Sequence, residues 1–219
     1  MSMTEDEYAY DEYMAQLYEE HKAEAIEEFT YERLQSYYSG NRLLAEPAFC
    51  MLSEAQNLIE VNATAGFIFG AIAMEVGLKE TLLKPIVFGL VHVASSASLV
   101  TNLVMSHQSM DRYKELLLQI LSDHGGVDLQ SYKRPGSSKT IWEEIKNVQT
   151  KRNSILHTAQ TASHEEAALA LGVASTIIGE LFHAVVMRMG LHLHDGFRVC
   201  DDWKCKYEGT EMEKIFKAT

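Results

Sequence analysis

One short run of residues combines the side chains that could cleave an RNA backbone without a metal ion. It reads Arg152-Asn153-Ser154-Ile155-Leu156-His157. A histidine with a pKa near neutrality can move the proton of a 2′-hydroxyl, while an arginine can hold the charge that develops on the phosphorane with two parallel hydrogen bonds. Asn153 could orient either group. The sequence therefore offers Arg152 and His157 as candidate catalytic residues, with Asn153 in support.

The spacing of Arg152 and His157 sets a geometric condition. At about 100° per residue, His157 lies about 140° around a regular helix from Arg152. One regular helix would then not aim both side chains at one phosphate. Either the helix unwinds at its end by His157, or two copies of the helix meet across a symmetric dimer. The dimer also supplies two histidines, which suits a reaction that needs both an acid and a base.

Two capping boxes predict where the helices around this run begin. Thr140 and Glu143 have the spacing at which a hydroxyl and a carboxylate each satisfy a free backbone donor, and Ser163 and Glu166 repeat it. The pattern predicts one helix that starts after Thr140 and ends between residues 157 and 161, and a second that runs from Ser163 to Gly190. The run at 152–157 should therefore occupy the last turns of the first helix.

The run Arg152-Asn153-x-x-x-His157, with a capped helix after it, resembles the Arg-Asn-x-x-x-His motif of HEPN domains (higher eukaryotes and prokaryotes nucleotide-binding). Residues 71–79, with Glu75 among them, resemble the apolar helix of that family, which often carries one acidic residue facing the motif. The resemblance covers roughly residues 45–190. The stretch from 86 to 130 looks longer than a minimal four-helix HEPN domain needs.

The resemblance implies an up-down helical bundle and a homodimer that brings both motifs into one cleft. It also implies metal-independent endoribonuclease activity, common in toxin–antitoxin and antiviral defence systems, with RNA as substrate and no cofactor. Arg152 and His157 carry over as catalytic residues, Asn153 as their polar support and Glu75 as a partner of Arg152. One departure is Ala159, which stands where some HEPN toxins have a tyrosine that an antitoxin modifies.

Two other interpretations of this run stay open. An arginine and a histidine in a last helical turn often only cap carbonyls, or pair with surface carboxylates such as Glu143, Glu144 or Glu165. The chain could also be a non-catalytic HEPN-like module that binds nucleotides or a protein partner. The lack of a dense Lys/Arg patch favours that alternative, whereas the presence of both Arg152 and His157 favours the ribonuclease.

A second group of residues has side chains of the kinds that bind zinc, namely His192 and His194 followed by Cys200 and Cys205. Residues 191–194 alternate as a strand does, Asp195-Gly196 is a hairpin signal, and residues 197–199 could return. The pattern predicts a small C-terminal β-hairpin with both histidines on one face. The spacing fits no standard zinc module, so we predict no metal site, although the sequence leaves metal binding by these four residues undecided.

The composition indicates a soluble, all-α, cytoplasmic protein. The chain has 219 residues, 47% of them hydrophobic, which is enough for one sizeable core, and its three prolines leave long stretches unbroken. Three cysteines and an acidic N-terminus do not fit a secreted disulfide framework. Residues 85–110 lack charged side chains, but their polar residues are too many for a membrane span, so we predict a buried core helix.

The net charge of −12 is unevenly distributed. Residues 1–33 hold eleven acidic residues against Lys22 and Arg33, so the rest of the chain carries only −3. This charge distribution does not fit a protein that binds duplex DNA. A local basic cleft could still bind a phosphodiester. Apolar residues recur at helical spacing in the acidic segment, which predicts an amphipathic helix that is either a solvated face or a contact surface for a partner. The HEPN resemblance implies an antitoxin or a defence-system protein as that partner.

We predict three parts: an acidic amphipathic helical extension over residues 1–40, a HEPN-like bundle with extra helices over 41–190, and a tail or hairpin over 191–219. Removal of residues 1–38 should spare the bundle if that extension serves only partner contacts. Within it we predict helices over 47–60, 65–84 and 109–123, the second of them central. Pro85 should kink or end the central helix. A loop over 127–138 should separate two packed groups of helices.

Overall fold

The computed structural model describes residues 31–90, 126–202, 204 and 205, together with positions 12, 13, 16, 122 and 123. The described chain is mostly helical and ends in a small antiparallel hairpin, which confirms the predicted all-α class. In chain order the elements are α2 (Glu46–Leu58), α3 (Ala63–Val76), η1 (Gly77–Leu83), α4 (Lys84–Leu90), α7 (Ile141–Thr158), α8 (His164–Ser175), η3 (Thr176–Leu181), α9 (Phe182–Arg188), β1 (His192–His194) and β2 (Arg198–Cys200). The acidic segment before residue 31, most of the core helix predicted over 85–110, and the helix predicted over 109–123 lie outside the described residues, apart from isolated positions.

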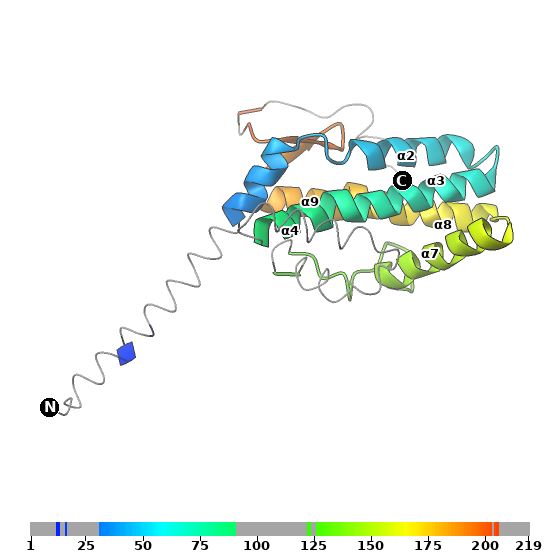
Figure 1. Cartoon of the computed structure of the whole chain (residues 1–219), viewed down its shortest axis with the longest axis horizontal. Coiled ribbons are helices and arrows are strands. Elements are labelled where there is room, and N and C mark those ends of the chain that lie inside the picture. Colours follow the sequence, from blue (N-terminus) through cyan, green and yellow to red (C-terminus); the bar gives the residue numbers. More distant parts are fainter. Residues whose placement is uncertain are drawn as a thin grey trace.

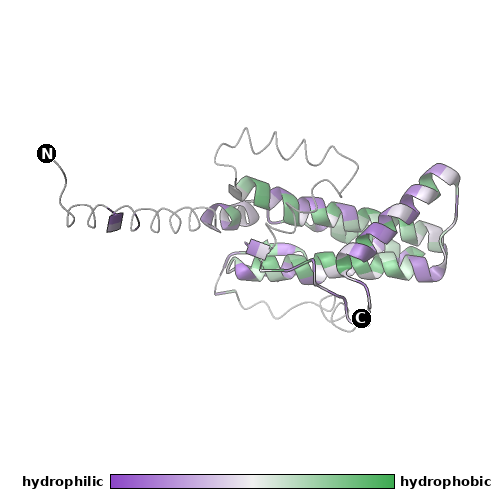
Figure 2. Ribbon diagram, turned by 90° about the horizontal axis from the view of Figure 1, so that it is seen from below, coloured by the Kyte–Doolittle hydropathy of each residue, from purple (hydrophilic) through white to green (hydrophobic). Residues whose placement is uncertain are grey.

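The helix that begins with α3 lies at the centre of the bundle, as predicted. It packs against α2, α7 and α8. Figure 1 shows α2, α3 and the helix containing α8 and α9 running side by side, with α7 crossing them obliquely. Glycine allows the close approach of α3 and α8, because a Cβ atom at Gly70 would lie only 3.3 Å from the backbone of Ala170. Figure 2 shows the apolar residues spread along these packed helices.

The loop over residues 126–140 is present, but it does not divide the helices into two groups. Helices α7 and α8, after the loop, pack against α3, before it. Buried side chains from both sides of the loop, and Leu129 within it, belong to one hydrophobic core. The loop therefore packs against a single bundle, and the prediction of two separate helical groups is wrong.

Pro85 does not end the central helix. Residues 63–90 are helical without a break, and the segment immediately before α4 is the π-helix η1. Proline has no N–H to offer to the carbonyl of Thr81, four residues earlier, which would ordinarily disrupt the helix. Here the hydroxyl of Tyr38 donates a hydrogen bond to that carbonyl at 2.8 Å. A donor from another helix thus takes the place of the missing backbone donor, which the sequence pattern around Pro85 alone does not reveal.

Tyr38 belongs to a helix over residues 31–40 that packs on the bundle. Tyr38 and Leu34 are both buried and are members of the hydrophobic core. Gln35 of the same helix donates a hydrogen bond to the carbonyl of Met189 at 2.8 Å. Residues 34 and 38 are thus part of the core, so this segment serves more than partner contacts, and we expect removal of residues 1–38 to destabilise the bundle.

Replacing Tyr38 with phenylalanine should lower the free energy of unfolding by about 1–3 kcal/mol, because the buried Thr81 carbonyl loses its donor. Burial raises the pKa of Tyr38 well above its ordinary value, so its hydroxyl stays a donor at any working pH. The matched control is Tyr37→Phe, since that half-buried ring packs on Phe88 at 5.0 Å between centroids. Urea unfolding of both variants checks this, and equal losses would contradict it.

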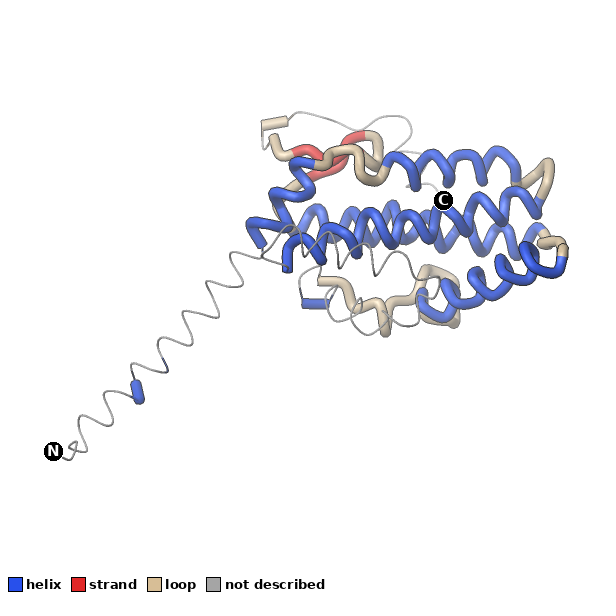
Figure 3. Tube along the Cα trace, viewed as in Figure 1, coloured by secondary structure: helices blue, strands red, loops and turns tan. Residues whose placement is uncertain are grey.

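The hairpin predicted after Gly190 is present, and Figure 3 shows it beside the turn that leads into α2. Asp195 and Gly196 both adopt positive φ, at 56° and 78°, as a tight hairpin turn requires. The N–H of Val199 donates to the carbonyl of Arg42 at 2.9 Å, and the rings of Phe49 and Phe197 lie 4.8 Å apart. The hairpin is therefore attached to the start of α2.

One helix among the described residues, His164–Arg188, is long and apolar enough to cross a membrane by length and composition alone. In its most apolar window, however, 56% of the residues are buried inside the bundle. That burial is typical of the core helix of a soluble protein. The segment over 85–110 that we considered as a span lies mostly outside the described residues.

Candidate functional site

Helix α7 carries the Arg-Asn-x-x-x-His run, and both of its ends are where the sequence predicts them. The N-terminal capping box is complete: the N–H of Glu143 donates to the Thr140 hydroxyl, and the N–H of Thr140 donates to the Glu143 carboxylate. At the other end Ala159 adopts a left-handed conformation with φ of 54°. The box at Ser163 is also complete and starts α8. The run therefore occupies the last two turns of a well-bounded helix.

Arg152 faces α3 and forms an ion pair there with Glu75. The Nη1 atom of Arg152 lies 3.4 Å from Oε1 of Glu75. The side chains are 30% and 18% exposed, so the pair is partly shielded from water and is stronger than a fully exposed one. The contact that the family resemblance implied between these two residues is thus present. The ion pair holds the guanidinium group of Arg152 against the bundle. Because that group is planar, the directions of its remaining N–H groups are then fixed as well.

His157 lies on a different side of α7 from Arg152. The helix stays regular through Thr158, and the N–H of Ala159 closes the last turn on the carbonyl of Ile155 at 3.1 Å. Unwinding at His157, one of the two arrangements considered above, therefore does not occur. The His157 side chain is exposed, and the angular separation of about 140° between Arg152 and His157 remains. The single chain brings Arg152 to Glu75, but does not bring His157 to Arg152.

Asn153 shares a face with His157 rather than with Arg152. The two are four residues apart on a regular helix, so their side chains are neighbours, and both are exposed. Lys146, Asn147 and Thr150 continue the exposed face of α7 toward its N-terminus. This face contains amides, a hydroxyl, a lysine and a histidine, and no carboxylate between residues 146 and 157. Asn153 is thus placed to orient His157 or a bound group, and the face is compatible with a phosphodiester.

Two of the three carboxylates considered as alternative partners, Glu143 and Glu144, are engaged elsewhere. Glu143 belongs to the capping box, and Glu144 is buried and paired with Arg134. Lys151, next to Arg152, pairs with Glu166 at 2.9 Å. Within the described residues, Arg152 pairs with the partly buried Glu75 of α3.

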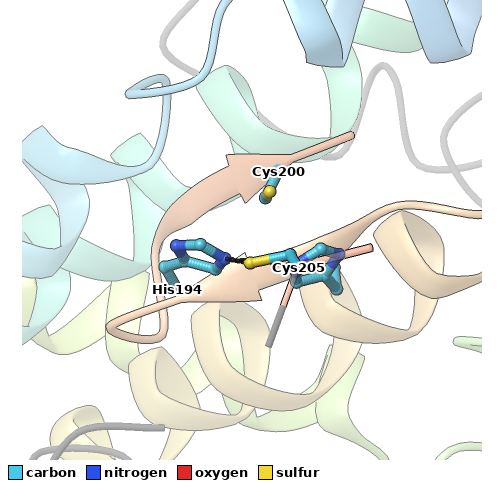
Figure 4. Close-up of side chains that lie close together, drawn as sticks. His194, Cys200 and Cys205 are labelled. Carbon is cyan, nitrogen blue, oxygen red and sulfur yellow. Dashed lines mark hydrogen bonds between the residues drawn. The ribbon is translucent and has the colours of Figure 1, made fainter. Parts of the chain in front are cut away.

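A second group of side chains, for which the sequence predicts no metal site, also comes together in the structure. His192, His194, Cys200 and Cys205 come together at the hairpin, and one ligand atom from each lies within 4.8 Å of the others. Figure 4 shows three of them, with the Cys205 sulfur beside the His194 ring. Figure 1 places the hairpin at the end of the bundle opposite the α7–α8 connection. The two candidate sites are therefore separate.

A surface pocket among the described residues is lined by residues of neither candidate site. It is formed between the helix over residues 31–40 and α4. None of the predicted site residues lines it; the lining residues are Glu32, Arg33, Ser36, Tyr37 and Phe88.

Comparison with known proteins does not identify the chain. No protein-family model matches it, and no curated protein or solved structure matches it significantly.

Proposed function

We propose that this chain is a metal-independent endoribonuclease of HEPN type, acting as a toxin-like or antiviral defence effector. The observation that carries the proposal is the Arg152–Glu75 ion pair, which fixes an arginine beside a polar helical face that bears Asn153 and His157. The residues that cleave RNA by acid–base chemistry are all present on α7, and one of them is held in place by α3.

The proposed reaction proceeds by attack of the substrate's own 2′-hydroxyl on the adjacent phosphorus. His157 of one protomer accepts the 2′-hydroxyl proton, and the oxygen forms a bond to phosphorus. The bond from phosphorus to the 5′-oxygen breaks, that oxygen takes a proton from solvent, and His157 returns its proton to solvent, so each cleft uses one His157 and the Arg152 of the other protomer. Arg152 holds the non-bridging oxygens as negative charge accumulates on them. The products are a 2′,3′-cyclic phosphate, which water can open to a 3′-phosphate, and a 5′-hydroxyl.

Glu75 acts in this proposal as a positioning residue for Arg152. Two fixed donors of a planar guanidinium can meet a phosphate only if the side chain is held in one orientation, and the ion pair supplies that orientation. Glu75 also partly neutralises Arg152, so the substrate phosphate must bind where the remaining N–H groups point. Arg152 lies in the last two turns of α7, so the proposed site of the reacting phosphate is at that end of the helix, away from the capping box.

The need for two copies follows from the regular geometry of α7, since one helix cannot aim both side chains at one phosphate. Leu156 supports the location of the contact: it lies one turn beyond Arg152, and its side chain is 56% exposed although it is large and apolar. A two-fold contact around Leu156 would bury that surface and bring His157 of each copy toward Arg152 of the other.

Substitution of Leu156 by aspartate should therefore raise the dissociation constant of the dimer by about tenfold or more. Met187 on α9 offers a matched control, because its side chain is 53% exposed and Met187→Asp places the same charge elsewhere on the bundle. Analytical ultracentrifugation of the wild-type chain and both variants measures this. A wild-type chain that sediments as a monomer at tens of micromolar would contradict the proposed dimer.

The activity itself is tested by incubating the purified full chain with single-stranded RNA of mixed sequence in a magnesium-free buffer. We expect products that end in cyclic or 3′-phosphates, and resistance at any step that carries a 2′-deoxy residue. Cleavage should continue with EDTA, because the proposed chemistry uses only side chains of α7. Products with 5′-phosphates, or cleavage of the 2′-deoxy substrate, would overturn the mechanism.

The second candidate is a non-catalytic HEPN-like module that binds a nucleotide or a protein partner. One observation favours it: the single chain keeps Arg152 engaged with Glu75 and leaves His157 exposed on another face. The low positive charge of the body also favours weak RNA binding. If the chain cleaves no RNA but still binds a partner through α7, this candidate is the better one.

A further inference from the structure

The hairpin presents two chemically different faces. Leu193 pairs with Val199 across the strands, and both side chains are buried in the hydrophobic core. His192 pairs with Cys200, so with His194, two residues along the strand, these side chains share the opposite face. One face therefore attaches the hairpin to the bundle, and the other gathers two imidazoles and a thiol.

The chain returns after β2 and adds a second thiol to this face. Asp202 makes the turn: its carboxylate accepts from the N–H of Lys204 at 2.9 Å, and its carbonyl accepts from the N–H of Cys205 at 3.0 Å. The Cys205 sulfur then lies 3.2 Å from Nε2 of His194, as Figure 4 shows, and that nitrogen lies 3.1 Å from Nε2 of His192. The four ligand atoms lie within 4.8 Å of one another.

These separations are close to those of ligands around one metal ion. Zn–N bonds of about 2.0–2.1 Å and Zn–S bonds of about 2.3 Å give tetrahedral edges of roughly 3.3–3.8 Å. Two nitrogen and two sulfur ligands in a tetrahedron are the set that selects zinc among the common cellular metals. Zinc binds cysteine as the thiolate, so a bound ion would hold the ligating sulfur atoms deprotonated.

We propose that His192, His194, Cys200 and Cys205 bind one Zn²⁺ ion in a closed, four-ligand structural site. Binding converts two thiols to thiolates and releases their two protons to solvent. Four protein ligands leave no coordination position for substrate, so the ion stabilises structure and does not take part in RNA cleavage. The proposal is independent of the proposed ribonuclease activity.

The ion would fasten the C-terminal segment to the start of α2. Arg42, in the turn before α2, pairs with Asp201 at 2.7 Å, and Asp201 is adjacent to the ligand Cys200. The backbone of Val199 is bonded to Arg42, as described above. A three-residue strand pair is marginal by itself. Zinc would join residue 205 to both strands and so hold the hairpin closed on the bundle.

The test uses the full chain, expressed in a reducing cytoplasm and purified without chelators. Mass spectrometry of metals should find about one zinc ion per chain in the wild type and in Cys50→Ser, the matched control, because Cys50 is exposed and distant from the hairpin in the sequence. Cys205→Ser should lose most of the zinc, by about tenfold or more. Cys205→His should retain it, since histidine is also a zinc ligand.

Cobalt binding supplies a second readout, measured on a protein that keeps all four proposed ligands. After removal of zinc, Co²⁺ added to Cys50→Ser should produce the intense visible bands of a tetrahedral site with two thiolates, and zinc should abolish them. Thiol titration of the wild type should detect one reactive thiol with zinc bound and three after chelation. Isolation without metal and without cobalt bands, or a mass that shows a Cys200–Cys205 disulfide in the native protein, would overturn the proposal.

Discussion

Replacing His157 or Arg152 with alanine should each lower the rate of RNA cleavage by about a hundredfold or more, as loss of an acid–base group or of an oxyanion partner usually does. His157 is exposed and lies in the last turn of α7, so its removal should leave helicity and the dimer unchanged. Arg152→Ala leaves Glu75 without its partner in a partly buried setting, so a modest loss of stability is expected in addition.

Two neighbouring residues provide controls of the same chemical type. His164 is also exposed and lies at the start of α8, with its Nε2 3.6 Å from Glu60, so His164→Ala should cleave RNA at the wild-type rate. Lys151 is next to Arg152 but pairs with Glu166, so Lys151→Ala should change binding of RNA more than the rate of cleavage. If His164→Ala fails as badly as His157→Ala, the loss does not report a catalytic role for His157.

Mixing the two inactive variants separates a composite site from one within a single chain. A heterodimer of Arg152→Ala and His157→Ala keeps one cleft in which arginine comes from one protomer and histidine from the other. With random exchange, about a quarter of the wild-type activity should return. Single-turnover cleavage of a short RNA measures this after the variants have been equilibrated together. No recovery, with heterodimers demonstrated by differential tagging, would require each chain to act alone.

Local signals were sufficient to predict the boundaries of the elements that carry the site. Each capping box involves residues only three positions apart, and the Asp195-Gly196 turn depends on two adjacent residues in the left-handed region. Such features depend on the chain itself and little on what packs against it, so they can be predicted from sequence. The end of α7 at Thr158 and the hairpin strands were predicted for this reason.

Features that depend on distant residues were missed. Nothing near Pro85 in the sequence shows that Tyr38 donates to the Thr81 carbonyl, and so nothing there shows that the helix does not end at Pro85. The many acidic residues before position 33 indicated an extension outside the bundle, so the burial of Leu34 and Tyr38 was not predicted. The Arg152–Glu75 pair, 77 positions apart in the sequence, was expected only from the family resemblance and not from spacing.

The spacing of His192, His194, Cys200 and Cys205 matches no standard zinc module, so the sequence did not predict a metal site at these four residues. The alternation of residues 191–194 already placed His192 and His194 on one face, and the register of the hairpin adds Cys200. The missing step was the turn at Asp202, which brings Cys205 back across the strands. An aspartate two residues before a lysine and three before a cysteine is a weak sequence signal, although an Asx turn there is physically ordinary.

Arg134→Ala should have the largest effect on stability, about 3–5 kcal/mol, because it leaves a buried carboxylate without its partner. The Glu144 side chain is 4% exposed, and its carboxylate accepts from Nε of Arg134 at 2.6 Å and from Nη2 at 2.9 Å. Ser137 donates to the same carboxylate at 2.8 Å. Gly172 of α8 leaves room for the guanidinium, since a Cβ atom there would collide with it.

The matched control is Arg42→Ala, which removes an arginine from an exposed ion pair. The Arg42 and Asp201 side chains are 54% and 40% exposed, so that loss should stay below about 1 kcal/mol. Replacing both members of the buried pair, as Arg134→Met with Glu144→Met, should recover most of the stability lost in Arg134→Ala, because no uncompensated charge then remains. Urea unfolding with an unchanged slope measures all three variants.

A loss of 3–5 kcal/mol, as estimated above, is a large share of the roughly 5–15 kcal/mol that a domain of this kind has available. The loop that carries Arg134 leads directly into the Thr140 cap, and the N–H of Ile141 donates to the carbonyl of Tyr132 at 2.9 Å. Tyr132 in turn donates to Glu180 of η3. The loop thus holds the first turn of α7 in position. Arg134→Ala should therefore also reduce RNA cleavage at temperatures near the melting temperature of the variant, and leave cleavage unchanged well below that temperature. A variant as stable as Arg42→Ala would show that the buried pair does not hold the loop.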